Sequence, residues 1–458
     1  MNRRELLRKT LCATAGSALF TALGGKLQLA HAAVKSGRVL DGVDYRALVC
    51  VFLYGGNDSF NMLVPRDTPH YNVYATGRGG LAIPQGDLLP LTSLNAASDG
   101  GLYGLHPSMA GLQGLFGSGR AALVSNVGPL LAPITKTQYQ NGSVPVPAQL
   151  FSHSDQQVLW QTPQAATANR RGWGGRLADL FSSTNPNQQL SMNISLAGEN
   201  IFQAGESVVP YFVSTDGAEG FNFVTQPWEQ ERRQTFLALR DASYAHPLQR
   251  QYASVVRRAM DNEVMVNAAL SGAAPLTTAF PDTYLGRQLR MVARLISARG
   301  ALQMQRQIFF VGVGGFDTHD NQLTDHTNLL AELSGGLQAF YSATVEMGLE
   351  DSITSFTASD FGRTLSINGD GTDHGWGGHQ IVVGGAVRGQ RYYGQFPNLT
   401  VEGPDDAGWG QIIPTTSVDQ YAATLARWYG LPDSDRSMVF PNLGNFATPD
   451  LGFMNPPV

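Results

Sequence analysis

The sequence contains very little cysteine, with only Cys12 and Cys50 among its 458 residues. Cys12 lies in an N-terminal segment that has the features of a removable leader, so the mature chain would keep Cys50 alone. No internal disulfide could then form, even in an oxidising compartment. Cys50 lies in the apolar run Ala47–Tyr54, which is typical of a core residue and not of a nucleophile.

Charged residues are also scarce, at 15% of the chain, and acidic residues outnumber basic ones by 36 to 31. The leader carries five of the basic residues and one acidic residue, which leaves 26 basic and 35 acidic residues in the mature chain. The resulting net charge of −9 argues against a nucleic-acid partner held by bulk electrostatic attraction.

Beyond the N-terminus the sequence has no apolar stretch long enough to span a membrane, so no membrane span is expected in the mature form. The N-terminus combines Arg3-Arg4, an apolar region from Thr10 to Leu23, and the small-residue pattern Ala30-His31-Ala32. This arrangement predicts a twin-arginine signal peptide over residues 1–32. It therefore predicts a periplasmic or secreted protein, exported in the folded state by the twin-arginine machinery. The alternative is a cytosolic protein that starts with an ordinary basic helix.

Motifs of several common active sites are missing. The sequence has no G-x-S-x-G nucleophile elbow, no phosphate-binding GxxxxGK[ST] loop and no convincing dinucleotide fingerprint. The pair Ser152-His153 is not expected to form a direct dyad, because adjacent side chains on an extended segment point apart. A Ser152 activated by a metal ion, or a metal-bound water, is the more natural nucleophile.

The most informative stretch runs from Ile308 to Gly385. Apolar runs at Ile308–Val313 and Ile353–Ala358 have the length and composition of buried strands, and a helix predicted over Asp325–Met347 connects them. A strand–helix–strand unit makes a parallel pair, and a further strand is predicted at Ala47–Tyr54. The fold class predicted from this pattern is α/β, with a central, mostly parallel sheet between layers of helices. Long loop insertions are expected at about 66–104 and 128–148.

Acidic and imidazole side chains follow these strands, at the sheet edge where open α/β folds place their ligand sites. Asp317 and His319 follow the first strand, Asp360 and Arg363 follow the second, and His374 lies in the next loop. Such groups can converge on a divalent cation. The alternative for Asp360 is an ion pair with Arg363.

The Gly55-Gly56 turn brings Asp58 to the end of the strand Ala47–Tyr54. Its alternative interpretation is an ordinary turn residue, because Asx turns are common. His379 begins a strand and is expected to be structural or to support a ligand.

Taken together, the motifs resemble an exported bacterial family known as domain of unknown function 1501, over about residues 45–455. The motifs are GGNDSFN, LHP, GGFDTHDNQ, SDFGRT, GTDHGWGGHQIVVGGAVRG and PTTSVDQYAATLARWYG. That family is placed in the alkaline phosphatase-like superfamily, with sulfatases and cofactor-independent phosphoglycerate mutases. The resemblance implies a central, mostly parallel sheet with helices on both faces.

By chain order, the resemblance also implies roles for individual residues. Ser152 falls where the superfamily keeps its nucleophile, and the implied metal ligands are Asp58, Asp317, His319, Asp360 and His374. The chain departs from the superfamily at Phe361, where an imidazole ligand is expected, and its Asp-Thr-His spacing is shorter than usual. These departures leave open a single metal, a different ligand set or a lost activity.

Two functions follow as hypotheses. The first is an exported hydrolase of phosphate or sulfate esters that uses one or two divalent ions, which could be zinc, calcium, manganese or magnesium. Here Ser152 or a water attacks a small-molecule or glycan ester, and Arg363 stabilises negative charge on its oxygens. The alternative is a catalytically degenerate member that acts as an exported binding or assembly factor with a co-encoded partner.

Overall fold

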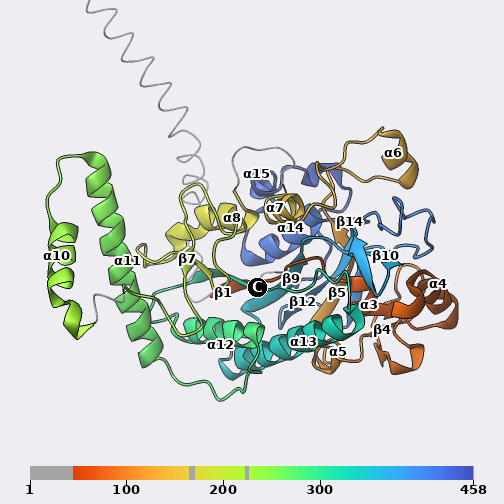
Figure 1. The fold of residues 1–458 in the computed structure, drawn as a ribbon, viewed down its shortest axis with the longest axis horizontal. Coiled ribbons are helices and arrows are strands. Elements are labelled where there is room, and N and C mark those ends of the chain that lie inside the picture. The colour runs from red at the N-terminus through yellow and green to blue at the C-terminus, as the bar shows by residue number, and fades with distance from the viewer. Residues whose placement is uncertain (1–44, 164–170, 222–225, 457–458) are drawn as a thin grey trace, which may run out of the picture.

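The computed structural model describes residues 45–163, 171–221 and 226–456, so the predicted signal peptide lies outside the described residues (Figure 1). Its centre is a nine-stranded sheet in the order β13-β5-β12-β9-β1-β8-β6-β7, with β14 beside β5. The strands are β1 Arg46–Leu53, β5 Ala121–Gly128, β6 Asn193–Ser195, β7 Tyr211–Phe212, β8 Arg306–Val313, β9 Ile353–Ser359, β12 Gly378–Gly384, β13 Arg391–Tyr393 and β14 Thr416–Ser417.

The middle of the sheet is parallel. β8 and β9 run in the same direction, as the strand–helix–strand pattern predicts, but they do not pair with each other because β1 lies between them and pairs with both. β6 and β7 extend the parallel part beyond β8, and β12 runs antiparallel to both β9 and β5. The predicted α/β class with a mostly parallel sheet is confirmed.

Helices cover both faces of the sheet (Figure 1). Every residue of β1 is buried, and alternate side chains face opposite layers. Val49 and Val51 pack with α5 (Ala110–Gly117), α12 (Tyr284–Ser297) and α13 (Gln322–Glu346). Cys50 and Phe52 pack on the other side with α8 (Trp173–Phe181) and α14 (Val418–Tyr429). The continuous apolar run in the sequence thus reflects a strand that is covered twice.

The segment from 229 to 272 is rich in helix-forming residues but forms two helices, α10 (Gln230–Asp241) and α11 (Pro247–Gly272). The break occurs at His246, whose backbone is extended, with φ −75° and ψ 128°. A residue that precedes proline is disfavoured in the helical conformation, whereas proline itself fits the first turn of a helix. Pro247 therefore starts a new helix after a short connection.

The 66–104 region is more ordered than a surface excursion. It contains α4 (Thr68–Arg78) and the short strands β3 (Leu89–Pro90) and β4 (Tyr103–Leu105), the latter paired with β2 (Leu63–Pro65). It also builds a small core in which Tyr74 and Leu88 pack with Phe60 and Leu365. The 128–148 region holds one short helix, α6 (Lys136–Asn141).

The remaining elements are short. They are α3 Ser59–Met62, α7 His153–Gln161, α15 Arg436–Val439, the antiparallel pair β10 Arg363–Asn368 and β11 Gly371–His374, and the 3-10 turns η2 Gly79–Leu81, η3 Gln85–Asp87, η4 Ser182–Thr184, η5 Pro227–Glu229, η6 Asp433–Asp435 and η7 Leu443–Asn445.

Candidate functional site

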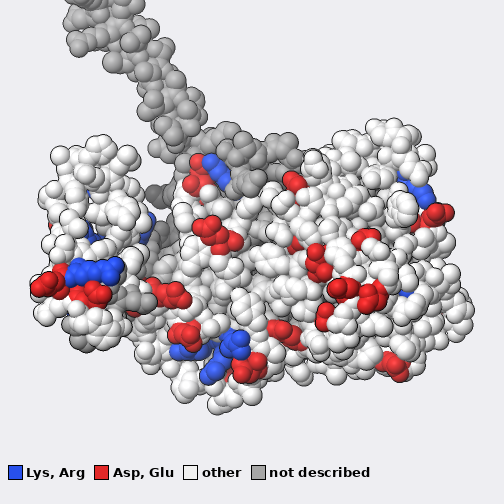
Figure 2. Space-filling model, in the orientation of Figure 1, with Lys and Arg blue, Asp and Glu red and all other residues white. Residues whose placement is uncertain are grey.

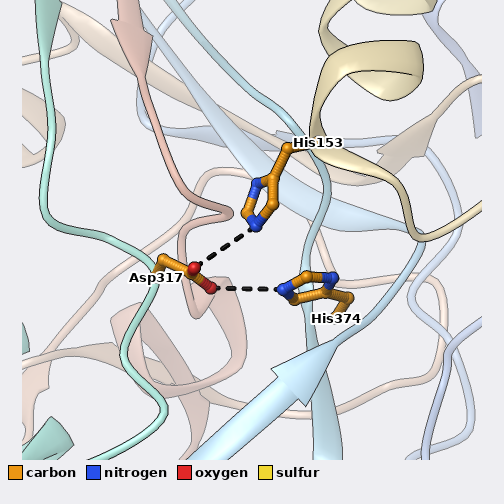
Figure 3. A group of neighbouring side chains, drawn as sticks. All are labelled: His153, Asp317 and His374. Carbon is orange, nitrogen blue, oxygen red and sulfur yellow. Dashed lines mark ion pairs between the residues drawn. The ribbon is translucent and has the colours of Figure 1, made fainter.

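Three histidines point toward the carboxylate of Asp317, which follows β8 at the carboxyl edge of the sheet. The Nε2 atoms of His319 and His374 lie 2.9 and 3.3 Å from Asp317 Oδ1, and His153 Nε2 lies 3.3 Å from Oδ2. Figure 3 shows the convergence of His153, Asp317 and His374. The turn at Gly55 permits this approach, because a Cβ there would lie 2.4 Å from the Asp317 nitrogen.

Each of these imidazoles is anchored at its other nitrogen. An oxygen acceptor next to Nδ1 binds the proton on that nitrogen. This leaves the Nε2 atom of each ring facing Asp317, either as a donor to its carboxylate or as a ligand to a cation bound beside it. The Nδ1 partners are Asp360 Oδ2 for His153 at 2.7 Å, the Phe151 carbonyl for His374 at 2.7 Å, and Asp373 Oδ1 for His319 at 3.2 Å. The Nε2 atoms of His319 and His374 are only 3.2 Å apart. Two lone pairs at this distance repel each other unless a proton or a cation lies between them.

Arg363 controls the charge of Asp317. Its Nη1 donates to Asp317 Oδ1 at 2.6 Å, and its guanidinium also donates to Gly55 and Thr372. The side chain is fully buried, and each of its nitrogens has a hydrogen-bond acceptor. Burial by itself would raise the pKa of Asp317, but the hydrogen bond and charge of Arg363 outweigh it and lower that pKa overall. Arg363 therefore keeps Asp317 ionised, so its ion pair is with Asp317 and not with Asp360. Its contact with substrate oxygens stays a prediction.

Asp360 supports His153 and forms no ion pair with His319 or His374. Its Oδ2 accepts from His153 Nδ1 at 2.7 Å and from Gln157 Nε2 at 3.0 Å, two side chains that lie one turn apart on α7. Burial raises the pKa of Asp360, and these hydrogen bonds oppose the increase. The structure thus places Asp360 behind His153, not among the groups that face Asp317.

Asp58 lies in a separate, fully buried ion pair. Its carboxylate accepts from Arg78 of α4, from Gln322 Nε2 at 2.6 Å, and from the backbone of Asn61 in α3. Burial raises the pKa of Asp58 and Arg78 opposes the increase. Donors occupy both carboxylate oxygens, and none of them is an imidazole, so the structure does not bring Asp58 into the site.

Ser152 precedes α7 and lies next to the site without joining it. Its hydroxyl donates to Asp155 Oδ2 at 2.7 Å, whereas the nitrogens of His153 are directed at Asp360 and Asp317. This arrangement agrees with the expectation that Ser152 and His153 form no direct dyad. The assignment of Ser152 as a nucleophile stays a prediction.

Sequence reasoning missed His153 as a possible ligand, because it considered this residue only as a base for Ser152. The residues around His153 do not show which groups it faces, since this depends on where α7 packs over the sheet. The one available signal in the sequence was weak: a histidine close to a carboxylate at the start of a helix.

The donor set fits a transition-metal ion. His153, Asp317 and His374 each offer an atom within 4.8 Å of the others, and His319 adds a third imidazole beside them. Imidazole nitrogens with one carboxylate suit zinc and related ions, whereas calcium and magnesium prefer oxygen ligands. Calcium and magnesium are therefore the poorer matches among the four ions considered.

Comparisons with solved structures find only distant similarity. Ps i-CgsB in complex with k-i-k-neocarrahexaose aligns over 86% of this chain and 74% of its own, at 9% identity and a TM-score of 0.32. The lipoteichoic acid synthase LtaP from Listeria monocytogenes aligns over 72% and 61%, at 9% identity and 0.29. A protein of glycosaminoglycan metabolism from Bacteroides thetaiotaomicron aligns over 86% and 74%, at 11% identity and 0.34.

No curated protein matches the sequence. Among the described residues, no helix is both long enough and apolar enough to cross a membrane. The family comparison is the informative one, because a profile described as "Protein of unknown function (DUF1501)" matches residues 45–408, well over half of the chain. The chain therefore belongs to the DUF1501 family.

Proposed function

We propose that this protein is an exported, metal-dependent hydrolase of phosphate or sulfate esters. The observation that carries the proposal is the convergence of three imidazole Nε2 atoms on Asp317, each with its Nδ1 atom held by an oxygen. Imidazole rings that are fixed by an oxygen at Nδ1 and grouped with their Nε2 atoms around a carboxylate are an arrangement typical of metal ligands.

His153, Asp317, His319 and His374 would hold the cation, with zinc the best match to the donors. Such an ion would supply Lewis acidity toward an ester oxygen and would make a nearby hydroxyl or water more acidic. The chain's own residues prepare this site: Arg363 keeps Asp317 ionised, and Asp360 fixes the orientation of His153. This set replaces two of the ligands expected from the sequence, Asp58 and Asp360, by His153.

Ser152 remains the proposed nucleophile, with a water as the alternative. Its hydroxyl donates to Asp155, which gives the proton an acceptor at 2.7 Å. The substrate would be a small-molecule or glycan ester.

Export by the twin-arginine machinery completes the proposal. This route carries folded proteins, which suits a site whose ligands come from three separate segments and converge only after folding. The N-terminal pattern at 1–32 supports it. Periplasmic fractionation of cells that carry Arg3→Lys/Arg4→Lys tests it, and full export of this variant would contradict it.

Elemental analysis of the purified mature protein, followed by assays with aryl phosphate and aryl sulfate esters, tests the site. We expect about one tightly held transition-metal equivalent, and its loss in His374→Ala. The matched control is His70→Ala, since His70 pairs with Asp67 near the surface, away from Asp317. No bound metal in the wild type, even after incubation with zinc, would overturn the proposal.

A second function, an exported binding or assembly factor with a co-encoded partner, has one observation in its favour. Phe361, where an imidazole is expected, is buried with its ring 4.9 Å from that of His153 and 4.6 Å from that of His374. The apolar ring of Phe361 takes up space beside these two imidazoles and cannot bind a metal ion. Metal binding without hydrolysis of any tested ester would favour this second function.

A further inference from the structure

The helical hairpin formed by α10 and α11 exposes an unusual amount of apolar surface. It stands apart from the sheet, at the left of Figure 1. Of the eighteen large apolar residues exposed in the described part of the chain, six lie between residues 228 and 264: Trp228, Leu239, Leu248, Tyr252, Val255 and Val264. Leu248 and Tyr252 are each 73% exposed, so the apolar surface lies on the outside of the hairpin.

These side chains border a groove between the two helices. The groove has a volume of about 630 Å³, and its apolar lining includes Phe236, Leu239, Tyr244, Leu248, Tyr252 and Val256. On α11, Leu248, Tyr252 and Val255 are spaced at i, i+4 and i+7, which makes a continuous exposed stripe along the edge of the groove. The hairpin therefore carries both an apolar groove and an apolar helical ridge.

The hairpin is poorly buried for its size. α10 has twelve residues and none of them is buried, and between Pro247 and Met260 the only buried residue of α11 is Ala253. Helices in proteins are stabilised mainly by packing of an apolar face, and a helix of twelve residues is marginal in water by itself. The apolar side chains of α10 and of the first half of α11 thus lack the packing partners that normally stabilise such helices.

The charges of the hairpin indicate what covers it. Residues 229–263 contain six arginines and five acidic residues, and Figure 2 shows both signs side by side on this part of the molecule. Arg240 and Arg257 both pair with Asp241. Helices that lie on anionic membranes are predominantly basic on their polar face. A nearly neutral surface of mixed sign does not repel its own copy, whereas the rest of the chain, with 25 basic and 31 acidic residues, is negative.

We propose that the hairpin docks against the hairpin of a second copy of this chain. In this twofold arrangement the ridge at Leu248 and Tyr252 of one copy lies in the groove of the other, and four helices bury the apolar faces together. This assembly does not depend on the proposed ester hydrolysis, because the hairpin holds none of the residues that face Asp317.

The interface of the proposed dimer is small, so we expect a low affinity. Residues 247–262 of α11 span about 24 Å at about 1.5 Å per residue. Two packed helices with their side chains are about 20 Å wide, so the hairpin face offers roughly 480 Å² in projection. A standard interface buries about 800 Å² per partner. The dimer is therefore expected to be reversible at micromolar concentration.

Sedimentation velocity of the mature protein at about 1 to 200 µM tests the proposal. We expect a concentration-dependent monomer–dimer equilibrium, weakened at least tenfold in Tyr252→Glu and in Leu248→Glu. The matched control is Leu94→Glu, because Leu94 is 59% exposed and lies outside the hairpin. Circular dichroism should show unchanged helix content in all three variants, since each replaced side chain is exposed.

Two results would overturn the proposal. One is a monomer at every concentration. The other is a dimer that Tyr252→Glu and Leu248→Glu leave intact. Co-sedimentation with vesicles of phosphatidylglycerol and phosphatidylethanolamine, lost in the same variants while the protein stays monomeric, would assign the hairpin to a membrane surface instead.

Discussion

Replacing Arg78 with methionine removes the cation from an ion pair in which both side chains are fully buried. Arg78 donates to Asp58 and, at 2.6 Å, to the carbonyl of Thr364, so it connects the 66–104 region to the strand that follows β9. Methionine fills much of the same volume but leaves the Asp58 carboxylate buried with only neutral donors around it. Breaking a buried ion pair from one side destabilises a protein by about 3–5 kcal/mol, and we expect a loss in this range.

The loss should depend on pH. Burial raises the pKa of Asp58, and removing Arg78 takes away the charge that opposes this increase, so the carboxyl of the variant takes up a proton more readily. A group with a raised pKa in the folded state favours folding at low pH and loses that contribution as the pH rises through the folded pKa. The penalty of Arg78→Met should therefore be larger at pH 8 than at pH 5.

Urea unfolding followed by tryptophan fluorescence measures these differences. Arg66→Met is the matched control, because Arg66 is exposed in the same region and its replacement should change the free energy of unfolding by less than about 0.5 kcal/mol. Adding Asp58→Asn to Arg78→Met should restore part of the loss, since a neutral amide needs no cation. A loss below about 1 kcal/mol, or one that appears only when a bound metal is removed, would refute the assignment of Asp58 to this pair.

Three further results are expected. His374→Gln should raise the zinc dissociation constant at least 100-fold in a competition assay with a chelator, and an unchanged constant would remove His374 from the ligand set. Asp360→Asn should raise it by only about 10–100-fold, because Asp360 acts through His153, and complete loss of metal would instead indicate direct ligation. Burial lowers the pKa of His379 to about 3, so its stabilising contribution is complete above about pH 6.5 and falls by about 1.4 kcal/mol per pH unit toward pH 3. His379→Gln should reduce the pH slope of the unfolding free energy by that amount between pH 6 and 4, and an unchanged slope would show that His379 can be protonated in the folded protein.

The central strands and the helix that connects two of them could be predicted because their signals are local. The run Ala47–Tyr54 has the composition of a strand covered on both faces, and the helix predicted over Asp325–Met347 is α13, Gln322–Glu346. The grouping of Asp317, His319 and His374 followed from the rule that parallel strands end at one edge. What local patterns could not supply was the partner of each side chain.

Where the structure separates the predicted ligands from one another, contacts between distant segments are the reason. Asp58 looks like a ligand until Arg78, buried in a region that reads as a surface loop, is seen to neutralise it. Asp360 looks like a ligand until α7 places His153 in front of it. In both cases a carboxylate at a strand end was correctly located and its neighbour was not, because that neighbour arrives by tertiary packing across up to 207 residues.

The departure at Phe361 can be understood in the same way. The resemblance implies an imidazole at this position, and its absence favoured the hypothesis that the activity was lost. In the structure the ring of Phe361 packs against His153, a side chain from α7 whose Nε2 atom faces Asp317. We infer that the missing imidazole is replaced in space by one from another segment, while Asp360 keeps its carboxylate at that place and orients the replacement. A degenerating site would lose the groups that support a ligand along with the ligand itself. Here Asp360 Oδ2 still accepts from His153 Nδ1 and Gln157 Nε2, which is the support that the proposed ligand His153 needs.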